Sequence, residues 1–307
     1  MIKTEHLSKR YGALTAVDDV SFQVGPGEVL GFLGPNGAGK TTTMRMLAGF
    51  VTPSAGSASI CGHDIEADPL AAKSSLGYLP EGAPTYGEMT VQGFLEFIAA
   101  LREIEGARRT ARLDYVIGRL QLEDVLEQTI ETLSKGFRRR VGLAQAIVHD
   151  PPVLILDEPT DGLDPNQKHE VRTLIDEMAR DKIIVISTHI LEEVEAVCTR
   201  AIIIARGRIV ADDTPLGLAA RSRYHNAVSL QLENTDQLPA FRTAVTALPS
   251  VAGVEVNERD ARLTALPRGG ATILPALSEL AAREGLKLKE LHLESGRLDE
   301  VFRTITV

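Results

Sequence analysis

A glycine-rich loop carries the residues with the clearest chemical meaning. Residues 34–41 fit the pattern Gly-x-x-x-x-Gly-Lys-Ser/Thr, in which Lys40 and Thr41 take the last two positions. Glycines let the backbone curl so that successive N–H groups point at phosphate oxygens, and a helix start behind such a loop adds partial positive charge. The loop therefore predicts a polyphosphate site, with the Lys40 ammonium against the β- and γ-phosphates. The residues expected around the phosphates are Gly34, Pro35, Asn36, Gly37, Ala38, Gly39, Lys40, Thr41 and Thr42.

A pair of acidic residues, Asp157 and Glu158, follows the apolar run 153–156. Ligands bind beside the carboxyl ends of parallel strands, so both side chains are expected at the phosphate site. Asp157 and the Thr41 hydroxyl are oxygen ligands that suit Mg²⁺, and Glu158 can polarise a water that attacks the γ-phosphorus. The alternative is an acidic pair that only favours a helix start through the helix dipole.

These residues need buried strands and helices to position them, and the sequence predicts such elements. Residues 29–33, before the loop, form an apolar run as in a buried strand, and residues 42–49 can form a helix closed by Gly49. Three later apolar runs are typical of a parallel sheet that is covered on both faces. These runs are residues 153–156, 183–186 and 201–204, separated by predicted helices at 165–180 and 190–197. The fold class is therefore α/β.

Two other regions belong to this first domain, which we place at residues 1–215. The chain up to about residue 25 alternates apolar and polar residues, which predicts antiparallel strands, and residues 57–61 and 75–79 resemble further short strands. Between 88 and 149 apolar residues recur at helical spacing. The sequence thus predicts a mixed sheet with a helical subdomain at about 83–150.

A second domain, residues 216–307, begins after a break near Thr214 and Pro215. Its first residues, 216–224, are predicted to form a short basic helix. The expected order is then strand, helix, strand, strand, helix, strand and a final helix, at residues 228–232, 236–248, 254–256, 262–266, 272–284, 288–293 and 297–305. The order β-α-β-β-α-β is that of a small α+β ferredoxin-like domain. It contains no glycine-rich loop or cluster of His, Cys or acids, so we expect a regulatory or docking role.

Composition excludes several classes of function. The net charge of −9, the 4% of aromatic residues and the lack of tryptophan argue against a general nucleic-acid partner, with the local exception of Arg138, Arg139 and Arg140. No apolar run reaches the roughly 18 residues that a membrane span requires, and the first residues lack a signal core. Cys61 and Cys198 lie far apart without metal-ligand spacing, so we expect reduced, buried thiols in a cytosolic protein.

Taken together, the motifs resemble the ATP-binding-cassette (ABC) ATPases, the nucleotide-binding subunits of transporters. The resemblance covers residues 1 to about 215. Residues 34–42 resemble the family's Walker A motif, 133–137 its signature motif, 153–158 Walker B, 163–165 the D-loop with Asp164, and 187–189 the segment that ends in the switch histidine, His189. Tyr11 falls where the family stacks an aromatic ring on adenine.

The resemblance implies a dimer that binds ATP and Mg²⁺. In the family two cassettes pair head to tail, so Ser134 and Gly136 would contact the partner's ATP from the start of a helix expected at 138–149. Glu158 and His189 would be catalytic. Two positions depart from the common signature, since Lys135 and Phe137 replace glycine and glutamine. Glu81 stands where the family usually has a glutamine, and its carboxylate can still ligate Mg²⁺.

The segments 79–81, 133–137 and 298–302 are similar to those of one subgroup, the ATPases of ABC-2 type exporters. This implies an ABC-2 type membrane permease as partner, a homodimer, no direct nucleic-acid contact, and a cytoplasmic location at the inner face of the cell membrane. The alternatives are an ABC ATPase that acts on ribosomes or DNA, and a module that only senses ATP. One phosphate loop, and a segment between residues 42 and 133 without sustained heptads, favour the transporter.

Overall fold

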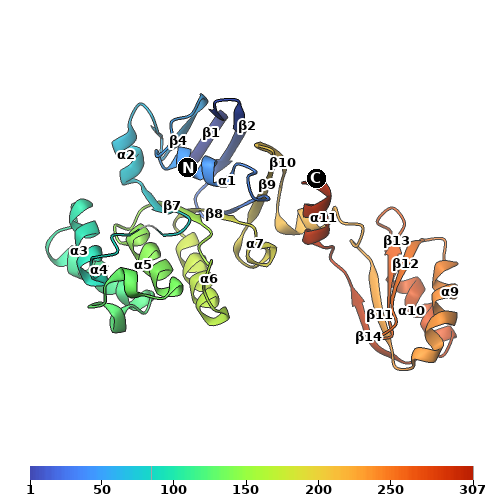
Figure 1. The fold of residues 1–307 in the computed structure, drawn as a ribbon. Coiled ribbons are helices and arrows are strands. Elements are labelled where there is room, and N and C mark those ends of the chain that lie inside the picture. The colour runs from blue at the N-terminus through green and yellow to red at the C-terminus, as the bar shows by residue number, and fades with distance from the viewer. Residues whose placement is uncertain (84, 307) are drawn as a thin grey trace. The chain divides into compact units, whose positions relative to one another are not determined.

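The computed structural model describes residues 1–83 and 85–306, which divide into two compact units, Met1–Asp212 and Asp213–Ile305 (Figure 1). Residues 84 and 307, which fall within the predicted helical subdomain and second domain, lie outside the described residues.

A six-stranded sheet forms the centre of the first unit, in the order β10-β9-β3-β8-β7-β6. Its strands are β3 (Val29–Leu33), β6 (Leu76–Leu79), β7 (Val153–Asp157), β8 (Ile183–Thr188), β9 (Arg200–Ala205) and β10 (Arg208–Asp213). The pairs β3–β8, β3–β9, β7–β8 and β6–β7 are parallel. Every residue of β3, β7 and β8 is buried, which explains their uninterrupted apolar sequences. The predicted α/β class is confirmed.

A second, four-stranded sheet in the order β2-β1-β4-β5 lies beside the central one. It is formed by β1 (Ile2–Tyr11), β2 (Leu14–Val24), β4 (Ala55–Ile60) and β5 (His63–Asp64), and is followed by the short helix α2 (Pro69–Ser74). Helix α1 (Lys40–Leu47) contributes Met44 and Met46 to a core that joins both sheets. Phe22 and Phe32, one from each sheet, meet there with ring centroids 5.6 Å apart.

Helices cover the other face of the central sheet and form a second hydrophobic core with it. They are α3 (Val91–Leu101), α4 (Gly106–Arg119), α5 (Lys135–Ile147), α6 (Pro165–Ala179) and α7 (Leu191–Val197), with short 3₁₀ turns η1 (Glu123–Val125) and η2 (Ile130–Thr132). The prediction for α5 was wrong at its start. The Ser134 hydroxyl accepts the Phe137 N–H at 3.3 Å and caps the helix, so Gly136 lies inside the first turn rather than before it.

The second unit contains a four-stranded sheet in the order β12-β13-β11-β14. Its elements are α8 (Pro215–Ala219), β11 (Val228–Leu232), η3 (Thr235–Gln237), α9 (Leu238–Thr246), β12 (Val251–Asn257), β13 (Arg262–Pro267), α10 (Leu274–Arg283), β14 (Leu288–Leu293) and α11 (Leu298–Ile305). Adjacent strands are antiparallel, and α9 and α10 share one core with the sheet (Figure 1). This is the ferredoxin-like arrangement.

Two smaller predictions require correction. The helix expected at 216–224 is only Pro215–Ala219 and contains no basic residue, because Arg221 and Arg223 follow its end. Cys61 and Cys198 are both free thiols, as expected, but each is only partly buried.

His149 joins the helical part of the first unit to its central sheet. It lies just after α5, and its Nε2 donates a hydrogen bond to the Leu76 carbonyl of β6 at 3.1 Å. Burial lowers the pKa of His149 to about 4, and the positive charges of Arg102, Arg112 and Lys182 act in the same direction. The imidazole is therefore neutral in the folded chain at neutral pH.

We predict that His149 makes the protein less stable in mild acid. In the unfolded chain, His149 binds a proton near pH 6.5, whereas in the folded chain it does so only near pH 4. The stabilisation that the neutral imidazole gives the folded state is therefore complete above pH 6.5 and is lost as the pH falls towards 4. Urea unfolding at pH 7 and pH 5 measures it. The loss of unfolding free energy should be about 1.5 kcal/mol smaller in His149→Gln, whose amide can donate to Leu76 without titrating. Equal losses in both proteins would contradict the assignment.

Candidate functional site

The phosphate loop connects β3 to α1 and depends on two glycines. Gly39 precedes α1 with a left-handed backbone (φ 108°), and a Cβ there would lie 2.5 Å from the Ala16 carbonyl oxygen. A Cβ on Gly34 would lie 2.5 Å from the carbonyl oxygen of Ile204. Both neighbours are backbone atoms, so only glycine fits without moving a strand or loop. The tight curl leaves the N–H groups of the loop and of the first turn of α1 at one end of the helix.

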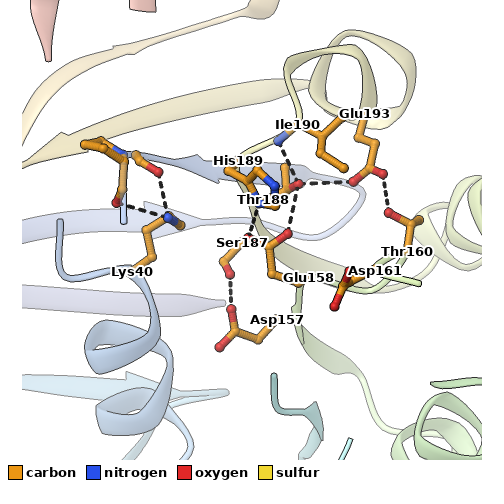
Figure 2. Close-up of polar contacts among 12 residues, drawn as sticks. Lys40, Asp157, Glu158, Thr160, Asp161, Ser187, Thr188, His189, Ile190 and Glu193 are labelled. Carbon is orange, nitrogen blue, oxygen red and sulfur yellow. Dashed lines mark hydrogen bonds and ion pairs between the residues drawn. The ribbon is translucent and has the colours of Figure 1, made fainter. Parts of the chain in front are cut away.

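Lys40, the first residue of α1, is a buried cation at the mouth of this loop. Its Nζ donates to the carbonyls of Gly34 at 2.6 Å and Pro35 at 3.3 Å (Figure 2). Burial lowers the pKa of Lys40, against the opposing charges of Glu158, Asp157 and Glu81. The ammonium thus sits among acids and carbonyl dipoles, where a phosphate oxygen is a favourable additional partner.

Asp157, the last residue of β7, has the properties of a cation ligand. It is 1% exposed, and its Oδ1 accepts a hydrogen bond from the Ser187 hydroxyl. Its Oδ2 is buried without a hydrogen-bond partner among the described residues. A buried unpaired carboxylate oxygen is costly, and a divalent cation would satisfy it. The described residues contain no cluster of three or more metal-ligating side chains, so Mg²⁺ would need phosphate oxygens and water as further ligands.

Glu158 and His189 meet at the adjacent strand ends, as Figure 2 shows. His189 Nδ1 donates to Glu158 Oε1 at 2.9 Å, and the Thr188 hydroxyl lies 3.4 Å from Oε2. The contact leaves His189 Nε2 as the ring atom that can reach a ligand. The Glu158 backbone is left-handed (φ 52°), which costs a residue with a Cβ about 1–2 kcal/mol. Such strain is found at functional sites, where surrounding contacts enforce it.

Sequence reasoning missed a second carboxylate behind this pair. Glu193, in the first turn of α7, is buried and accepts hydrogen bonds from Thr160 and, at 3.1 Å, from Thr188. Lys168 Nζ lies 3.5 Å away. The position of Glu193 shortly after His189 on a helix start was the available signal, but only the fold shows which threonines it contacts.

The signature residues lie elsewhere in the unit. Ser134 is at the N-terminus of α5, which packs into the helical core, whereas α1 packs into the core on the other side of the sheet. Lys135 forms an ion pair of 2.8 Å with Asp161, which lowers the pKa of that acid. The charge of Lys135 is therefore paired within its own chain.

The remaining predicted residues have simple surroundings. Asp164 caps α6 by accepting the Gln167 N–H at 2.9 Å, and Gln167 returns a contact to the Asp164 backbone. Tyr11 ends β1 half-exposed, with Lys9 Nζ 5.1 Å from its ring centroid. Glu81 is exposed in the turn after β6, and its charge reaches Lys40. The contacts of these three side chains with ATP and Mg²⁺ stay predictions.

Comparison with known proteins finds related sequences and structures. A model of the family described as ABC transporter matches residues 17–161. The chain is 40% identical to Nod factor export ATP-binding protein I of Paraburkholderia xenovorans, over 71% of this chain and 72% of that one. It is 30% identical to the linearmycin resistance ATP-binding protein LnrL of Bacillus subtilis, over 100% and 98%. A solved ATP-binding subunit of an ABC transporter has a TM-score of 0.68 at 31% identity, covering 72% of this chain and 92% of that one.

We predict that Gly34→Ala weakens ATP binding at least about tenfold. The added methyl would displace the Ile204 carbonyl or the loop itself, and so misalign the loop N–H groups. Titration with a fluorescent ATP analogue measures the affinity. Gly25→Ala is the matched control, since its Cβ would meet only Glu28 Oε2 at 3.9 Å. Unchanged affinity in Gly34→Ala would show that the triphosphate binds elsewhere.

Proposed function

The chain belongs to the ABC transporter family of ATP-binding ATPases, and from that premise we propose that it drives export through a separate membrane permease of ABC-2 type. The Glu158–His189 contact beside Lys40 is the observation that supports a hydrolysing subunit over one that only senses ATP. Two relatives are named for export and for drug resistance, and the second spans both units of this chain. Co-purification with a small multi-spanning protein would support the proposal, and ribosomes or DNA in its place would contradict it.

The hydrolytic step assigns a role to each side chain at the strand ends. Glu158 accepts a proton from the water whose oxygen attacks the γ-phosphorus, and ADP leaves as the bond to the γ-phosphate breaks. His189 Nε2 orients the water and the γ-phosphate, while Lys40 offsets the phosphate charge. Mg²⁺ bound at Asp157 and Thr41, with Glu81 nearby, would neutralise further negative charge. Tyr11 stacks on the adenine in this scheme.

The position of Ser134 supports a site shared between two copies. Its helix packs away from the phosphate loop of the same chain, so its N–H groups and those of Gly136 are proposed to contact the nucleotide of a second copy. Asp164 begins α6 close to the signature, since a Cβ on Gly136 would lie 2.9 Å from Gln167 Oε1 in the first turn of that helix. ATP then holds a homodimer shut, and loss of the γ-phosphate lets it open.

An apolar groove provides a docking site for the permease. It has a volume of about 1220 Å³ and lies between the region of α2, the end of β6 and α3. Its apolar walls include Phe50, Leu70, Tyr86, Phe94 and Leu101. Most of these are exposed, which is unusual for large apolar side chains gathered in one place. Three basic residues, Lys73, Arg102 and Arg108, also line it, so we propose that a short segment with apolar and acidic residues binds there.

The second unit is proposed to regulate or dock the transporter without chemistry of its own. No glycine-rich phosphate loop occurs in its sequence, and no metal-ligating cluster is found among the described residues. No helix in the described part of the chain is long and apolar enough to cross a membrane. We propose that the protein is cytoplasmic and reaches the inner face of the membrane through the permease.

We predict that Glu158→Gln retains ATP binding but lowers ATP turnover about 100-fold or more, because the amide cannot accept the proton of water. The uncleaved ATP should trap a dimer, visible by size-exclusion chromatography. Glu192→Gln, an exposed position in α7, is the control and should behave as the wild type. Wild-type turnover in Glu158→Gln would refute the catalytic assignment.

We predict that Leu101→Glu abolishes capture of the permease while the isolated chain keeps its ATPase rate. Leu101 is 66% exposed in the groove, so the charge is tolerated in the free chain but would be buried unpaired on docking. Co-purification and ATPase assays measure the two effects. Val210→Glu, at an exposed apolar residue of β10 (42%) that does not line the groove, is the control. Retained capture in Leu101→Glu would place the permease elsewhere.

A further inference from the structure

Arg139 is a buried charged residue that the hydrolytic step above does not use. It lies on α5, the helix that Ser134 begins, and only 4% of it is exposed. The basic cluster seen in the sequence is therefore no exposed patch, because Arg140 is also buried. The Arg139 guanidinium donates to backbone carbonyls of Pro80 (Nη1, 3.0 Å), Pro159 (Nε, 3.4 Å), Asp157 and Glu158 (both Nη2).

These carbonyls come from two segments that reach the proposed hydrolysis site. Pro80 precedes Glu81 in the turn after β6, and the other three follow one another at the end of β7. Burial lowers the pKa of Arg139, and the charges of Asp161, Asp157, Glu158 and Glu81 oppose this. An apolar side chain of similar size would fill the space without the cost of desolvating a charge. What the guanidinium adds is its planar set of donors, which only arginine supplies.

The Arg139 donors bind the backbone on both sides of the strained residue, Glu158. Glu158 has the left-handed conformation, and the carbonyls on both sides of its Cα, those of Asp157 and Glu158, accept from the same Nη2. The Glu158 N–H donates to the Ser187 carbonyl at 2.9 Å, and its own carbonyl also accepts the Asp161 N–H at 3.1 Å. Both peptide groups next to Glu158 are therefore fixed, and so is the direction of its Cα–Cβ bond, from which the carboxylate extends towards His189.

We propose that Arg139 is a positioning residue for hydrolysis, which holds the Glu158 carboxylate against His189 and ties it to the helix that begins at Ser134. The inference rests on the proposed function, in which Ser134 contacts the nucleotide of the second copy. A shift of α5 on binding that nucleotide then moves the backbone that carries the carboxylate of the chain's own site. The Lys135–Asp161 ion pair also joins α5 to the segment that follows β7, at a position closer to solvent.

Steady-state kinetics of Arg139→Gln and Arg139→Lys test the proposal. We expect kcat to fall about 10- to 100-fold in Arg139→Gln, since a small misplacement of a catalytic group has effects of this size, while KM for ATP changes less than about threefold. Arg139→Lys, which keeps the charge but has a single donor group, should lie between it and the wild type. Combined with Glu158→Gln, Arg139→Gln should still form the ATP-dependent dimer, because binding and closure do not need the carboxylate to be aligned.

Arg140→Gln is the matched control for loss of a buried arginine. Arg140 lies on the same helix and is 7% exposed, but it donates to the Leu120 carbonyl and to Gln121, both at 3.3 Å. It should lower the melting temperature as Arg139→Gln does, yet leave kcat unchanged. Equal kcat in the two glutamine variants would overturn the proposal, as would a defect confined to KM.

Two further outcomes are decisive. If Arg139→Gln does not fold, Arg139→Lys is compared with Arg140→Lys, and equal kcat in this pair overturns the proposal. If the wild type neither hydrolyses ATP nor forms an ATP-dependent dimer, the proposed function fails, and the inference fails with it. A wild type that does both, beside Arg139 variants with unchanged kcat, would refute the inference alone.

Discussion

The parallel register of three buried strands is the constraint on which the site depends. Leu33 of β3 pairs with Thr188 of β8, and Asp157 of β7 pairs with Ser187 of β8, so the three strands end at one edge of the sheet. The phosphate loop, the acidic pair and His189 each follow one of these ends. A one-residue slip in any pair would turn Asp157 or Glu158 away from Lys40. The uninterrupted apolar sequences of the strands, which burial on both faces requires, therefore also secure the alignment of polar groups that lie beyond them.

The site concentrates charged side chains in a largely buried environment. Lys40 and Arg139 bring buried positive charge to the same edge as Asp157 and Glu158, and burial lowers the pKa of both basic groups while the acids oppose it. Hydrogen bonds to backbone carbonyls satisfy much of this charge, whereas Asp157 Oδ2 has no partner among the described residues. A polar site built in this way costs folding free energy and is arranged before a ligand arrives, which is what electrostatic catalysis requires.

The site residues that could be predicted from sequence are those whose role is indicated by their neighbours along the chain. Lys40 follows a glycine loop, Glu158 follows an apolar strand, and the element order of the second unit is visible in its periodicity. The Thr160 contact of Glu193 and the carbonyl contacts of Arg139 join segments distant in sequence, and the left-handed backbone of Glu158 is held by such contacts, so no spacing rule reports them. The start of α5 was misplaced because Ser134 was interpreted as a ligand-binding residue, and its second role as a helix cap was overlooked.

Strand β7 divides its side chains between two separate cores. Leu154 and Leu156 belong to the helical core, and Val153 and Ile155 belong to the core that contains α1. The sheet therefore acts as a partition, and a sliding movement of the helical layer can proceed without repacking the layer that carries the phosphate loop. Asp157 and Glu158 lie at the end of this strand, so both layers border the acidic pair.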